Sequence, residues 1–87
     1  MQLVHRPVRL LGWRDAVARF GCSRSKLYAD VASGLVPRPV TRGPRFARWP
    51  DNEIDAVVQA RVGGAGDADI RVLVTDLMQK RAAQGNA

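Results

Sequence analysis

The side chains that could do chemistry in this sequence are mainly hydroxyls and cations, and they stand in two groups. The first group lies within six consecutive positions and comprises Ser23, Arg24, Ser25, Lys26 and Tyr28. The second group consists of arginines at every third position, Arg42, Arg45 and Arg48. Guanidinium, ammonium and hydroxyl groups donate hydrogen bonds to anions, and arginine matches phosphate oxygens with two parallel donors. Both groups therefore indicate anion binding.

Residues for catalysis or metal binding are scarce. Asp51, Glu53 and Asp55 form an acidic cluster, but their spacing suits the positive end of a helix and no histidine accompanies them. The single histidine, His5, and the single cysteine, Cys22, are too few for a structural zinc site or an intramolecular disulfide. We expect Cys22 to be a small half-buried residue rather than a redox switch. The sequence thus predicts no enzymatic activity, no metal, no cofactor and no small-molecule ligand.

The charge of the chain is unevenly distributed. Its 87 residues include 14 basic and 8 acidic side chains, a net charge of +6. Residues 1–50 hold ten basic and two acidic residues, whereas residues 51–87 hold four and six. Such asymmetry is typical of a protein with one polyanion-binding face. No apolar run approaches the roughly 18 residues of a membrane span and the N-terminus lacks the apolar stretch of a secretory signal, so we expect a cytoplasmic protein.

Two short helices are expected to position the first group of polar residues. Residues 13–20 carry apolar side chains at helical spacing, and Gly21 ends this helix. Ser23 is a favourable N-cap for a second helix over residues 24–33, which Gly34 would terminate. Only three residues separate the two helices, which is the length of a helix-turn-helix connection.

The second group of polar residues falls on an expected hairpin. Residues 8–11 form a short extended segment, and residues 40–49 have the composition of two strands joined by a tight turn at Gly43-Pro44. Pro50 suits the first position of a third helix that runs to residue 62. The expected inner face of that helix consists of Ile54, Val57, Val58 and Val62. The aromatic and aliphatic side chains most expected in the core are Trp13, Phe20, Trp49 and Ile54.

A glycine-rich linker, residues 63–66, separates this first domain, residues 1–62, from a C-terminal amphipathic helix over residues 67–84. The apolar stripe of that helix consists of Ile70, Leu73, Val74, Leu77 and Met78. Two interpretations of the stripe are open. It completes the core of the first domain, or it is an interface for a partner protein or for a second copy in a homodimer. A dimer would allow two half-sites to be read.

The order helix, short turn, helix, hairpin, helix is that of a winged helix-turn-helix domain, so we expect a mostly α fold with a small β-hairpin and an extra C-terminal helix. If Leu27 faces the core, rotation by 100° per residue turns Ser25 and Ala29 outward. The helix over residues 24–33 would then enter the major groove of double-stranded DNA. The hairpin over residues 40–49 would act as the wing and place its arginines on a neighbouring backbone or in a narrow minor groove.

Several runs of residues resemble the AlpA family of prophage regulatory proteins, within the MerR-like and excisionase-like group. The matching runs are Gly21-Cys22-Ser23-Arg24-Ser25-Lys26-Leu27-Tyr28, Gly34-Leu35-Val36-Pro37-Arg38-Pro39-Val40, and Gly43-Pro44-Arg45 followed by Trp49, Glu53, Ile54, Asp55 and Ala56. The resemblance covers residues 10–61 and implies a sequence-specific DNA binder that regulates transcription of a prophage or genomic island. It thereby implies a nucleoid-associated protein of bacterial or phage origin. The DNA contacts it implies fall on Ser23, Arg24, Lys26, Tyr28 and Arg45. Phe46 and Pro50 depart from the family pattern.

Two alternatives to a transcriptional regulator remain open at this point. An excisionase-type factor would use the same domain to bend attachment-site DNA and recruit an integrase. A protein-binding adaptor would instead dock its C-terminal helix into a partner, such as the transcription machinery, and use the basic face only for solvation. RNA binding is less favoured, because no pair of exposed aromatic residues for base stacking is evident.

Overall fold

The computed structural model describes residues 7–85, so His5 lies outside the described part of the chain. The elements, in chain order, are β1 (Leu10–Leu11), α1 (Trp13–Phe20), α2 (Arg24–Ala32), β2 (Val40–Thr41), β3 (Ala47–Pro50), α3 (Asp51–Val62) and α4 (Asp67–Gly85). The fold is mostly helical with one small antiparallel sheet, as the sequence predicts. No helix among the described residues combines the length and apolarity needed to cross a membrane.

The tight connection between α1 and α2 has the predicted form. Gly21 adopts a left-handed conformation with φ of +67° and ends α1, while Gly34 follows α2 with φ of +78°. Such positive φ values are open to glycine at no steric cost. The Ser23 hydroxyl oxygen accepts a hydrogen bond of 3.1 Å from the backbone N–H of Lys26 and caps α2. The N-cap prediction is therefore confirmed.

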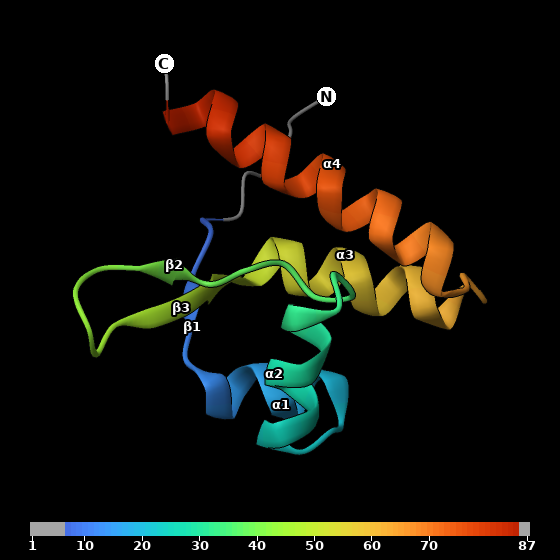
Figure 1. Ribbon diagram of the computed structural model, residues 1–87, viewed down its shortest axis with the longest axis horizontal. Helices are drawn as coiled ribbons and strands as arrows, with labels where there is room; N and C mark the ends of the chain where they lie inside the picture. The colour runs from blue at the N-terminus through green and yellow to red at the C-terminus, as the bar shows by residue number, and fades with distance from the viewer. Residues whose placement is uncertain (1–6, 86–87) are drawn as a thin grey trace.

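The sheet has three strands in the order β1-β3-β2, all antiparallel. The β2–β3 hairpin is confirmed, but its loop is longer than the two-residue tip expected from the sequence. The N–H of Arg42 donates to the carbonyl of Phe46 at 3.2 Å, which leaves three residues between them. Positive φ at Gly43, +74°, turns the chain there. In Figure 1 this hairpin extends away from the helices.

Strand β1 joins the sheet on the far side of β3, and the sequence analysis did not predict this pairing. Leu10 lies opposite Pro50, which makes Pro50 the last residue of β3 rather than the first residue of α3. Asp51 closes the junction, because its N–H donates to the Arg9 carbonyl at 2.8 Å and its carboxylate accepts from the Arg9 N–H at 3.1 Å. Asp51 is thereby buried with its hydrogen bonds made.

One hydrophobic cluster joins α1, α2, the sheet and the start of α3. Its buried members are Leu11, Ala16, Leu27, Val36, Trp49 and Ile54. Trp49 and Ile54 are fully buried as predicted, and the Trp49 indole N–H donates to the Pro37 carbonyl at 2.8 Å. Trp13 and Phe20 are only partly buried at the edge of this cluster, so the prediction that they are core residues holds in part.

A second cluster lies between α3 and α4, which run beside each other in Figure 1. Its buried members are Leu35, Val57, Ile70 and Val74, with Leu73, Leu77 and Met78 packed against them. Ile70 is fully buried, Val74 is 7% exposed, and Leu73, Leu77 and Met78 are half-buried against them, so the stripe predicted as a partner or dimer interface packs largely against the chain's own core. The structure therefore favours the core interpretation of α4.

Val62 is a correction to the predicted inner face of α3, since it is 78% exposed. At 100° per residue, Val62 lies about 80° from Ile54 and about 140° from Val57 around the helix, which takes it off the buried side. The following segment, residues 63–66, forms a compact turn in which the Ala65 N–H donates to the Ala60 carbonyl at 3.0 Å.

Candidate nucleic-acid interface

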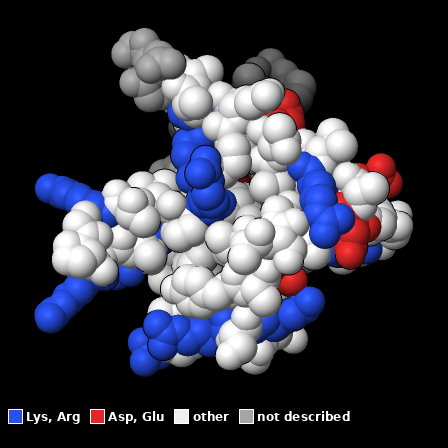
Figure 2. Space-filling model, in the orientation of Figure 1, with Lys and Arg blue, Asp and Glu red and all other residues white. Residues whose placement is uncertain are grey.

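The two predicted groups of polar residues meet around one open cleft. The N-terminal ends of α1 and α2 form one side of it and the hairpin forms the other. The residues that line it are Leu10, Gly12, Trp13, Arg14, Asp15, Arg24, Tyr28, Pro44, Arg45, Ala47 and Arg48. We call this the basic cleft, because four of these side chains are arginines and one is acidic. Figure 2 shows basic side chains extending from the hairpin and along the edge formed by α1 and α2.

The start of α2 exposes its polar side chains as the sequence predicts. Ser23, Arg24, Ser25 and Lys26 are all exposed, while Leu27 is fully buried and fixes which side of the helix faces out. The Ser23 cap uses the hydroxyl as an acceptor, so its O–H remains able to donate to an anion. These groups lie where a helix also presents its unpaired N–H groups and the positive end of its dipole.

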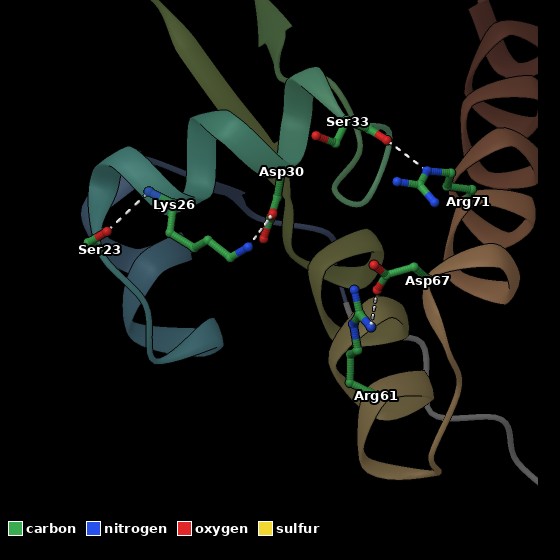
Figure 3. A network of polar contacts seen from close by, with 7 residues as sticks. All are labelled: Ser23, Lys26, Asp30, Ser33, Arg61, Asp67 and Arg71. Carbon is green, nitrogen blue, oxygen red and sulfur yellow. Dashed lines mark hydrogen bonds and ion pairs between the residues drawn. The ribbon is translucent and has the colours of Figure 1, made fainter.

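Lys26 has a partner within its own helix. Its ammonium nitrogen lies 3.0 Å from a carboxylate oxygen of Asp30, one turn later (Figure 3). The lysine side chain is 62% exposed, so this pair contributes little to stability and can be exchanged for a phosphate. The pair therefore holds Lys26 along α2 without removing it from the candidate interface.

Arg24 is held in place by aromatic rings. Its guanidinium carbon lies 4.4 Å from the centre of the Trp13 ring and 5.8 Å from that of Tyr28. Arg14 lies over the same indole at 4.6 Å. Such cation–π contacts restrict a long flexible side chain while leaving its N–H donors free. The sequence analysis expected Trp13 in the core, so it missed this contact between one aromatic ring and two arginines.

Tyr28, expected from the sequence to contact DNA, also packs against the core. Its ring makes an edge contact with Trp49, with centroids 5.9 Å apart and planes at 64°. The residue is nevertheless 38% exposed and lines the basic cleft. One edge of the ring thus belongs to the core while the other faces the interface.

The three hairpin arginines differ in their surroundings. Arg42 and Arg45 are exposed, and Arg45 lines the basic cleft. Arg48 is half-buried, with its guanidinium 4.7 Å from the centre of the Phe46 ring and one N–H donating to the Ala47 carbonyl at 3.0 Å. Phe46 is half-buried beneath Arg48, which accounts for the aromatic residue at this position.

Besides Lys26, four cations outside the basic cleft form ion pairs with acids among the described residues. The pairs are Arg19 with Asp55, Arg61 with Asp67, Lys80 with Asp76 and Arg81 with Glu53. By contrast, no carboxylate among residues 7–85 lies within ion-pairing distance of the four arginines of the basic cleft. Asp15, the one acidic residue that lines the cleft, offsets only part of their positive charge, so the cleft favours binding of an anion.

Other reactive groups are sparse in the described residues. Burial, and secondarily the negative charge of Asp30, raise the pKa of the half-buried Cys22 thiol, so it stays protonated and weakly nucleophilic near neutral pH. Within residues 7–85, no three His, Cys, Asp or Glu side chains come together as metal ligands would.

Comparison of the chain with protein-family models, with curated proteins and with solved structures finds no match. The resemblance of residues 10–61 to the AlpA family stays a prediction from the sequence.

Proposed function

We propose that this protein binds double-stranded DNA in a sequence-specific manner through a winged helix-turn-helix domain. In this proposal α2 enters the major groove as the recognition helix, and the β2–β3 hairpin is the wing. The observation that carries it is the basic cleft, where four arginines without acidic partners converge between the exposed start of α2 and the hairpin.

The two sides of the cleft have complementary tasks. An α-helix fits the major groove, where an arginine can donate two hydrogen bonds to guanine and so contribute about 1–3 kcal/mol of discrimination. Arg24, held over Trp13, is the residue best placed for that reading, and Ser25 and Ala29 are exposed on the same helix. Hydroxyl and backbone N–H groups at the start of α2 suit phosphates, which fix the register on the duplex.

The hairpin extends the contact along the nucleic acid. Arg42 and Arg45 are exposed on a loop that projects from the body of the protein (Figure 1). Arginines on such a projection suit a narrow minor groove, whose negative potential attracts cations. Arg48 lies deeper in the cleft and is suited to the phosphates between the two grooves.

The resemblance to the AlpA family supports a role as a transcriptional regulator of prophage or genomic-island type. A protein-binding adaptor is less favoured, because the inner face of α4 is already buried against α3. The proposal thus assigns the specificity to DNA contacts from α2 and the wing.

Selection of fragmented genomic DNA by the purified protein, followed by sequencing at two salt concentrations, tests this proposal. The expected result is one recurring motif at both concentrations, because base contacts survive partial screening of phosphate contacts. A variant with Arg24→Ala and Lys26→Ala should lose the motif. The control variant Arg61→Ala removes an exposed cation next to the α3–α4 turn and should keep it.

Retention of DNA without any motif, vanishing as salt rises, would overturn sequence-specific binding. Retention of the motif by the Arg24→Ala, Lys26→Ala variant would overturn the assignment of α2 as the recognition helix. Clusters of adjacent sites that fill cooperatively would indicate an excisionase-type architectural role for the same interface.

A further inference from the structure

The segment that connects α2 to β2, residues 33–39, is held by side chains from distant parts of the chain. We call it the connector. The Ser33 carbonyl accepts a hydrogen bond of 2.9 Å from Arg71 Nε, and the Arg38 carbonyl accepts one of 2.8 Å from an Arg81 N–H. Both donors belong to α4. The two ends of the connector are thus tied to one helix.

Both arginines have further neighbours around the connector. The Arg71 side chain lies beside the start of the connector, since a Cβ placed on Gly34 would lie 3.7 Å from Arg71 Cγ. Arg81 forms a two-pronged ion pair with Glu53 of α3, and Glu53 is 8% exposed at its side chain. Leu35, within the connector, is buried in the cluster formed with α3 and α4.

The connector determines how α2 and the hairpin lie relative to each other. The Ser33 carbonyl stands at the C-terminal end of α2, where carbonyls lack intrahelical partners and a cation is favourable. Figure 3 shows the Arg71 guanidinium reaching from α4 to this carbonyl. The Arg38 carbonyl lies two residues before β2. A displacement at either end would therefore change the angle between the helix and the hairpin.

We propose that Arg71 and Arg81 are positioning residues for DNA recognition, through which α4 fixes the orientation of α2 relative to the β2–β3 hairpin. This inference rests on the proposed function, in which those two elements contact DNA together. Neither arginine touches DNA in this account. They reduce the conformational freedom that binding would otherwise have to remove, so they matter most for the specific complex, in which both elements must fit at once.

The first test measures orientation without DNA. Spin labels attached after Ala29→Cys on α2 and Pro44→Cys in the hairpin loop, in a Cys22→Ser background, report the distance between the two elements. Arg71→Met should broaden the distance distribution, because the α4 contact at the end of α2 is lost. Arg71→Lys, which retains a donor, should restore most of the narrow distribution. Arg61→Met is the matched control, since it removes a cation and an ion pair near the start of α4 without touching the connector.

The second test uses DNA. Arg71→Met should weaken binding to the selected motif by about three- to tenfold relative to Arg61→Met, the range of couplings transmitted between sites, while binding to a scrambled sequence changes by less than about twofold. Thermal unfolding followed by circular dichroism checks that each variant is folded. Because Arg71 is exposed, we expect Arg71→Met to fold.

The outcomes separate the two proposals. An unchanged distance distribution in Arg71→Met, or equal losses for motif and scrambled DNA, would overturn the positioning role. A broadened distribution in Arg71→Met, combined with no sequence-specific binding by the parent protein, would overturn the proposed function while leaving α4 as the element that orients α2.

Discussion

The ion pair between Arg81 and Glu53 should be the most sensitive polar contact of the fold. Arg81 comes from the last turns of α4 and Glu53 from the first turn of α3, 28 residues earlier. Their side chains are 21% and 8% exposed. Replacing Arg81 with methionine retains most of the side-chain volume but leaves the buried Glu53 carboxylate without its partner. The Arg38 carbonyl also loses the hydrogen-bond donor that Arg81 supplies.

The magnitude follows from this burial. Removing one partner of a buried pair costs about 3–5 kcal/mol of stability. Because the Arg81 side chain is partly exposed, we expect a loss at the lower end of this range, about 3 kcal/mol. A chain of this size has a total stability of roughly 4–13 kcal/mol. With an unfolding entropy of about 2 cal/mol/K per residue, the loss corresponds to a fall in Tm of roughly 17 °C.

Urea denaturation followed by far-UV circular dichroism measures this loss, with an unchanged slope showing that the denatured state is comparable. Lys80→Met is the matched control, because Lys80 is the neighbouring residue and makes an exposed pair with Asp76 at 3.1 Å. It should cost less than about 0.5 kcal/mol. Adding Glu53→Gln to Arg81→Met should recover part of the stability, since the buried charge is gone. Equal effects of Arg81→Met and Lys80→Met would refute the reasoning.

Three further predictions concern the core, the thiol and the Trp13 ring. Ile70→Ala should lower the free energy of unfolding by about 3 kcal/mol in chemical denaturation, because Ile70 is fully buried between α3 and α4. Val72 is 70% exposed on the same helix, so the control Val72→Ala should change it by less than about 0.5 kcal/mol. An unaltered stability in Ile70→Ala would restore the partner interpretation of the stripe. The raised pKa of Cys22 should delay its reaction with Ellman's reagent to higher pH than in the unfolded chain. Because the folded state then keeps a proton that the unfolded state has lost, the free energy of unfolding should fall as pH rises between the unfolded and the folded pKa of this thiol. A pH midpoint of the Ellman reaction that is lower in the folded than in the unfolded chain would contradict the raised pKa. Trp13→Leu should weaken motif binding about two- to fivefold in fluorescence anisotropy, since Arg24 loses its contact with the Trp13 ring. An unchanged affinity in a folded variant would show that this contact does not contribute to DNA binding.

Local signals in the sequence were sufficient for the helices and their caps. Gly21, Ser23 and Gly34 each act through their own backbone or through a neighbour within three residues, so their roles can be predicted without knowing the fold. The groups of cations on α2 and the hairpin were likewise visible as runs of residue types. Their convergence on one cleft followed from the expected order of elements.

The features that the sequence did not predict depend on contacts between distant residues. The extended segment expected at residues 8–11 contains strand β1, but its pairing with β3 was not predicted, because a strand of two residues is too short to show an alternating pattern. In the sequence, Arg81 looks like an ordinary cation near the C-terminal end of a helix, and only the packing of α4 on α3 brings it to Glu53. Trp13 was expected in the core because a large aromatic on the inner face of a helix usually lies there, but at the first residue of α1 it is only partly buried and two arginines contact its ring.

The salt dependence of binding to the selected motif tests the central claim most directly. Six cations face the proposed interface, namely Arg14, Arg24, Lys26, Arg42, Arg45 and Arg48. A cation that binds in a groove or at a phosphate displaces counterions from the duplex. If each of the six displaces the counterion of one phosphate, the logarithm of the binding constant should fall with the logarithm of salt concentration with a slope of about −5.4. The variant with Arg24→Met and Arg45→Met should reduce the slope to about −3.6, whereas Arg61→Met with Lys80→Met should leave it at about −5.4. Equal reduction of the slope by both pairs of substitutions would contradict the assignment of the basic cleft as the DNA interface.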